Sequence, residues 1–193
     1  MGHFILFASP WWANILIFVP IVCFIIFNKK KLSLSKSQLI TAAIFGMAFG
    51  FIEAATVVYL RAALGFLPGF SVSLAQAAKQ SLNIYQQTQA LGRLPQSLMA
   101  VEIFRELATL VILVATALLA ARSPRERWAV FLWLFAAWDI FYYVGLWLVI
   151  RWPYSLTTPD VLFLIPVPWL AEVWFPILVS ILTMLAIFLC NES

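Results

Sequence analysis

Long apolar segments separated by short polar connections make up most of the chain. Each of the five segments has the length that a helix rising about 1.5 Å per residue needs to cross about 30 Å of hydrocarbon. The sequence therefore predicts an all-α integral membrane protein, with a bundle of five transmembrane helices in a single membrane domain over residues 1–193. The predicted spans are approximately 11–27, 39–60, 100–121, 128–150 and 173–190.

The composition of the chain supports this class. Hydrophobic residues make up 64% of the sequence and charged residues 10%, whereas soluble domains carry about 25% charged residues. An ordinary soluble domain is therefore excluded. The length of 193 residues leaves no room for a separate soluble catalytic domain beside five spans, so any chemistry is expected in or beside the membrane.

Basic residues are distributed unevenly between the two ends of the predicted spans. One side holds Lys29, Lys30, Lys31, Lys36, Arg122, Arg125 and Arg127. The other side holds Lys79, Arg93 and Arg151. Because cytoplasmic loops carry the excess of Lys and Arg, we expect an external N-terminus, a cytoplasmic C-terminus and a location in the cell membrane, which is the inner membrane in a bacterium. These short basic runs fit anionic lipid headgroups, whereas nucleic acid needs a continuous basic face.

Two external connections are longer than turns. Between Leu74 and Tyr85, within external segment 67–98, apolar residues recur at helical spacing and predict a short helix on the membrane or over the bundle. Segment 151–172 is apolar but contains Pro166 and Pro168 and is too short to span. Non-helical backbone at membrane depth must be shielded by protein or line a hydrated cavity. We therefore expect a Pro-rich re-entrant or lid segment, in which Asp160 and Glu172 are possible lid residues.

Ionisable residues lie within the otherwise apolar spans. Glu53, Arg105, Glu106 and Asp139 are the main examples, and such a group is costly in hydrocarbon unless it is paired, hydrated or neutralised. Helical rise places Glu53 and Glu106 roughly 10 Å below the external surface and Asp139 about one helical turn deeper than the adjacent tyrosines. These residues predict a buried polar site in the outer half of the bilayer.

Helical spacing also predicts which side chains face one another. Glu102, Arg105 and Glu106 share one face of the third span, and Asp139, Tyr142 and Tyr143 share one face of the fourth. In the second span, Glu53 aligns with Gly46 and Gly50, small residues that let a neighbouring helix approach closely. Three helices are thus expected to present polar groups to one pocket that binds a ligand or a partner.

The charges in this predicted pocket do not balance. Glu53, Glu102, Glu106 and Asp139 face only Arg61 and Arg105. Either some carboxyls are therefore protonated, or a cation or a cationic group of a ligand or partner completes the site. If a metal is present, Glu53, Glu106 and Asp139 are its candidate ligands, and oxygen donors suit Mg, Ca or Mn. With only Cys23, Cys190 and His3 available, haem, copper and iron-sulfur ligation have no support.

Each candidate also has a structural interpretation. The residues from Glu102 to Glu106 could form an intrahelical salt-bridge cluster near the headgroups. Arg61, at a helix end, fits a headgroup anchor. The two tyrosines could serve packing, and Asp160 could cap a turn. Glu53 and Asp139 are the hardest to explain in this way, since they lie furthest from water.

The sequence leaves three functional hypotheses. The leading one is a non-catalytic accessory subunit or binding module of a larger membrane complex, with lipids and other membrane subunits as partners. An alternative is an enzyme that acts on a lipid or isoprenoid near the external leaflet, with a carboxylate as acid or base, or a metal, and with Arg105 orienting an anionic group. A further alternative is ion or proton transfer through intramembrane carboxylates. Common nucleotide-binding, hydrolase and lipidation motifs are absent.

Overall fold

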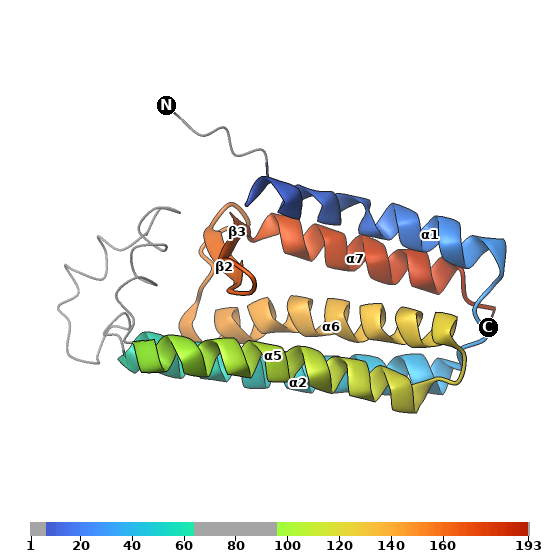
Figure 1. The fold of residues 1–193 in the computed structure, drawn as a ribbon, viewed down its shortest axis with the longest axis horizontal. Coiled ribbons are helices and arrows are strands. Elements are labelled where there is room, and N and C mark those ends of the chain that lie inside the picture. Colours follow the sequence, from blue (N-terminus) through green and yellow to red (C-terminus); the bar gives the residue numbers. More distant parts are fainter. Residues whose placement is uncertain (1–6, 64–95, 193) are drawn as a thin grey trace.

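Most of the described chain is helical. The structure, a computed structural model, describes residues 7–63 and 96–192 (Figure 1). The predicted helix between Leu74 and Tyr85 lies outside these residues, as do most of segment 67–98 and His3. The helices are η1 (Trp11–Phe18), α1 (Val19–Lys29), α2 (Lys36–Ala63), α5 (Gln96–Ala120), α6 (Pro124–Ile150) and α7 (Trp174–Leu189).

Among the described residues, four helical segments are long and apolar enough to cross a membrane. They are η1 continued by α1, then α2, α5 and α6, and they coincide with four of the predicted spans. The fifth predicted span corresponds to α7, an apolar helix of 16 residues. The fold therefore fits a mostly helical, multi-pass membrane protein.

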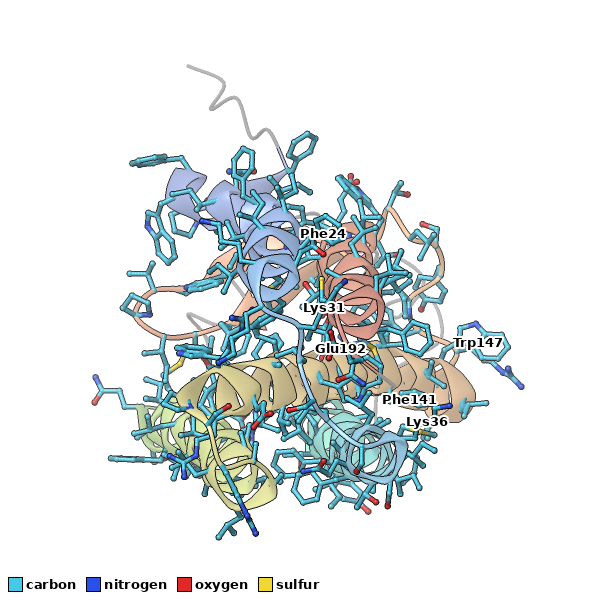
Figure 2. All side chains as sticks on the ribbon, turned by 90° about the vertical axis from the view of Figure 1, so that its right-hand side faces the viewer. Phe24, Lys31, Lys36, Phe141, Trp147 and Glu192 are labelled. Carbon is cyan, nitrogen blue, oxygen red and sulfur yellow. The ribbon has the colours of Figure 1, made fainter. Side chains whose placement is uncertain are left out.

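Helix α6 is the centre of the bundle. In the most apolar stretch of 18 residues of α6, half of the residues are buried. In the corresponding stretches of the other three candidate spans, 17–22% of the residues are buried. Helices α1 and α7 lie side by side on one side of α6, and α2 and α5 lie on the other (Figures 1 and 2). A capping box starts α6, because the Ser123 and Glu126 side chains each accept a hydrogen bond from the other's backbone N–H group.

Two glycines bring α2 into close contact with α6. The two helices run in the same direction, and Gly46 and Gly50 on α2 face the α6 backbone. A Cβ atom at Gly50 would lie 2.6 Å from the Trp138 carbonyl oxygen and 2.9 Å from the Tyr142 amide nitrogen. This close contact with α6 positions Glu53, which lies about one turn further along α2 and binds Arg105 of α5.

Replacing Gly50 with alanine is expected to lower the free energy of unfolding by about 1–3 kcal/mol, because the new methyl group overlaps backbone atoms that cannot move independently. The higher helix propensity of alanine, worth about 1 kcal/mol, opposes this loss but does not cancel it. Thermal unfolding in detergent measures the change. Ala48→Leu, at an exposed position of the same helix, is the control, and equal stability of the two variants would contradict the packing described here.

A small antiparallel sheet covers the end of the bundle where α6 ends and α7 begins (Figure 1). Its strands are β1 (Ala8–Ser9), β2 (Pro159–Phe163) and β3 (Trp169–Glu172), in the order β1-β3-β2. These strands were not predicted from the sequence, because a short, wholly apolar run lacks the alternation that identifies a half-buried strand. Strands β2 and β3 form a hairpin within the segment predicted to be re-entrant or lid-like.

Candidate functional site

The candidate residues form several bonded groups around α6 and the hairpin. The ionic triad consists of Glu53, Glu102 and Arg105. The hairpin clamp consists of Glu106 with the backbone of Leu164 and Ile165. The tyrosine cluster consists of Arg61, Tyr142, Tyr143 and Asp160.

The ionic triad joins α2 to α5. Arg105 donates from Nη1 to Glu53 Oε1 across the two helices. Its Nε and Nη2 atoms lie 2.9 and 2.8 Å from Glu102 Oε2, one turn away on the same helix. The side chains of Arg105, Glu53 and Glu102 retain 24%, 14% and 10% of their exposure. The intrahelical pair considered from the sequence therefore exists, and the same arginine also binds the second helix.

The hairpin clamp connects α5 to the turn between β2 and β3. Leu164 N–H is shared between the two carboxylate oxygens of Glu106, at 3.1 and 2.9 Å, and Ile165 N–H lies 3.2 Å from Oε1. The Glu106 residue is buried, at 6% exposure. It lies ten residues after Gln96, which places it roughly 15 Å from the start of α5 along the helix axis. The carboxylate thus satisfies backbone donors that are not part of a helix or strand ladder.

Aromatic rings hold the same hairpin against α6. The Phe163 ring is stacked on Phe135 with centroids 6.0 Å apart, and it also contacts Trp138 and Trp169. Phe135 lies 15 residues before Ile150, roughly 22 Å from the end of α6. The hairpin tip therefore reaches well below the end of the helix against which it packs.

The tyrosine cluster lies nearer the end of the bundle. Tyr143 donates its hydroxyl to Asp160 Oδ2 at 3.1 Å, and Tyr142 contacts the Tyr143 ring. Arg61 Nη2 lies 4.0 Å from Asp160 Oδ1, while the guanidinium carbon stands 3.8 Å from the centroid of the Trp152 ring. Burial raises the pKa of the Asp160 carboxyl above its ordinary value, and the Arg61 charge opposes that rise. Asp160 therefore belongs to the packed interior between α2, α6 and β2.

The remaining two acidic candidates bind other partners. Asp139 Oδ2 accepts a hydrogen bond of 2.8 Å from Ser180 Oγ, which joins α6 to α7. Glu172 Oε2 accepts from the indole N–H of Trp174 at 2.7 Å. The structure does not place Asp139 in the hydrogen-bonded groups of Glu53 or Glu106.

The three carboxylates suggested for a metal are divided between different groups. Glu53 binds Arg105, Glu106 binds the hairpin backbone and Asp139 binds Ser180. Within residues 7–63 and 96–192, no three His, Cys, Asp or Glu side chains are placed to hold a metal ion. The conditional metal set considered from the sequence is thus not assembled in the described part of the chain.

Several partners in these groups were not identified from the sequence. Neither Ser180 and Trp152 nor the backbone of Leu164 and Ile165 was considered as a partner of these side chains. Ser180 and Thr183 lie three residues apart on the buried face of α7. That spacing was the available signal for a polar contact with a neighbouring helix.

Comparison of the chain with protein-family models, curated proteins and solved structures finds no match. Within residues 7–63 and 96–192, the fold is mostly helical and has four candidate membrane spans.

Proposed function

We propose that the protein is a non-catalytic accessory subunit or binding module of a larger membrane complex. The observation that carries this proposal is the hairpin clamp. Both carboxylate oxygens of Glu106 accept backbone N–H groups, so the side chain is engaged in holding the fold. A general acid or base instead needs a carboxyl within hydrogen-bond reach of a substrate proton.

The other polar groups support the same proposal. Arg105 divides its donors between Glu53 and Glu102 and is therefore not directed at an anionic substrate group. Asp139 is bonded to Ser180 on the neighbouring helix. Polar contacts of this kind between membrane helices fix their packing, and small residues such as Gly46 and Gly50 accompany them. The polar side chains therefore support a protein whose role is to bind other subunits.

We also propose a topology of five spans, with α7 as the fifth and the C-terminus in the cytoplasm. The 16 residues of α7 extend over roughly 24 Å, and α7 lies beside α1 along the bundle (Figure 1). The end that faces the viewer in Figure 2 carries Lys31, Lys36 and Glu192, and the positive-inside rule assigns this basic end to the cytoplasm. The hairpin is then a re-entrant segment of the outer half.

A reporter enzyme fused after residue 193 tests this orientation. Reporter activity only on the external side overturns the proposed cytoplasmic position of the C-terminus.

The mass of the particle in its native membrane tests the assembly proposal. Membranes are solubilised directly into polymer-bounded lipid discs, and the affinity-tagged chain is analysed by native mass spectrometry. We expect particles that contain the 21.8 kDa chain together with at least one different polypeptide. Particles that hold only this chain, across several polymers and expression levels near the natural one, contradict the proposal.

A further inference from the structure

The ionic triad is incompletely covered by the described chain. The Arg105 side chain keeps 24% of its exposure although it holds two carboxylates. It lies nine residues into α5, roughly 13 Å from the start of that helix, and Glu53 lies ten residues before the end of α2, roughly 15 Å from that end. Charged side chains within a membrane span are costly when they face acyl chains. Their exposed part therefore requires a polar neighbour.

The surroundings of the triad are apolar and exposed. On α5, Val101 lies one turn before Arg105 and is 58% exposed; on α2, Ile52 beside Glu53 is 59% exposed. An ionic centre within an exposed apolar surface is the pattern of a helix interface inside a membrane, where polar groups fix the partner and small or apolar side chains pack around them.

The charge of the triad specifies the partner. Two carboxylates face one guanidinium, so the group carries one net negative charge when both acids are ionised. Burial of that charge against a cationic side chain neutralises it, whereas burial against a neutral helix leaves a carboxylate uncompensated. The opposite side of α5 differs, because its open groove is lined by Leu110, Val111, Val114, Ala115 and Leu118. That wholly apolar groove suits lipid.

We propose that the ionic triad is the contact site for a transmembrane helix of a different polypeptide, which carries a Lys or Arg side chain at the same depth. This inference rests on the proposed function, since it names the chemistry of the partner in the complex. The partner helix packs beside α2 and α5, where Arg105 links the two helices, and places its cation between Glu53 and Glu102. Arg105 then shares its two carboxylates with a second positive charge.

Site-specific photocross-linking in native membranes tests the position of this contact. A benzophenone amino acid is introduced at Val101 or Ile52 beside the triad, and at Val114 or Ile44 as exposed controls on other faces of the same helices; these four residues are 58%, 59%, 46% and 59% exposed. We expect Val101 and Ile52 to cross-link to a transmembrane peptide of another protein that contains Lys or Arg, with about tenfold lower yield from the controls.

A charge-removing variant tests the chemistry of the same contact. Glu102→Gln makes the triad neutral, retains an acceptor oxygen for Arg105 and leaves the Glu53 pair intact. We expect recovery of the partner to fall about tenfold, while the unfolding temperature of the purified chain changes by only a few degrees. Glu172→Gln, which removes an acid outside the triad, is the matched control and leaves partner recovery unchanged. A charge swap completes the test: Glu102→Lys combined with replacement of the partner's Lys or Arg by Glu should restore recovery of the partner.

Several outcomes overturn the inference. In the cross-linking experiment, these outcomes are equal yields from all four positions, or cross-links only to lipid, to another copy of this chain or to residues of the same chain. In the test of the charge, the outcome is unchanged partner recovery with Glu102→Gln. If the native particle still contains a second polypeptide, these results overturn the contact site and leave the proposed function standing. A particle with this chain alone overturns both.

Discussion

Replacing Arg105 with methionine is expected to lower the free energy of unfolding by about 3 kcal/mol, because it leaves the Glu53 and Glu102 carboxylates without their cation. Removing one partner of a fully buried ion pair costs about 3–5 kcal/mol. The lower end applies here since 24% of the Arg105 side chain is exposed. Denaturant unfolding of the detergent-solubilised chain, followed by tryptophan fluorescence, measures the change.

Arg61→Met provides a matched control for this prediction. The exposure of the Arg61 side chain, 23%, is close to that of Arg105, but its contact with Asp160 is 4.0 Å long. A loss of about 1 kcal/mol is expected, from the weak ion pair and the stacking on Trp152. If both variants lose the same stability, the loss reflects removal of an arginine from a membrane helix in general, and the triad has no special role.

Replacing Glu106 with leucine is expected to release the hairpin from α5. Two partly buried backbone donors, those of Leu164 and Ile165, lose their acceptors, and each unsatisfied group costs up to about 1–3 kcal/mol when it is buried. Leucine is close to glutamate in size, so the change removes the hydrogen bonds with little change in packing. Hydrogen exchange of the peptide that contains residues 163–169 measures the effect, and we expect its protection to fall by about a factor of 100 relative to the unchanged protein, equivalent to about 2.7 kcal/mol.

Two further variants make the result specific. Glu106→Gln keeps one acceptor oxygen and should show intermediate protection. Glu172→Gln changes an acid of the same hairpin that binds only the Trp174 indole, and its exchange in residues 163–169 should match that of the unchanged protein. Full protection of this peptide in Glu106→Leu would show that aromatic packing alone holds the hairpin.

The helices and several of their faces follow directly from the sequence. Apolar length alone located the segments that form α1, α2, α5 and α6, since a helix long enough to span hydrocarbon needs an almost unbroken apolar run. The spacing of Gly46, Gly50 and Glu53 indicated that this face of α2 meets another helix, and the structure places the two glycines against the α6 backbone.

The partners of the polar side chains were harder to predict. Helical periodicity gives the direction of a side chain from its own axis, but not which helix stands there or how deep it lies. Glu106 and Asp139 were therefore assigned to one pocket, whereas one binds the hairpin backbone and the other binds Ser180. A backbone N–H group carries no sequence signal of its own. Only the prolines near Ile165 indicated a non-helical segment whose donors would need acceptors.

We propose that Glu106 and the ionic triad hold the fold together and that the triad presents an ionic surface to a partner. A cryo-electron microscopy map of the complex isolated in native lipid discs, at a resolution that defines side chains, tests it most directly. We expect Glu106 to lie against the amides of Leu164 and Ile165, and a basic side chain of a second polypeptide to lie beside Glu53 and Glu102. A map with Glu106 turned to lipid and the hairpin outside the bundle contradicts it.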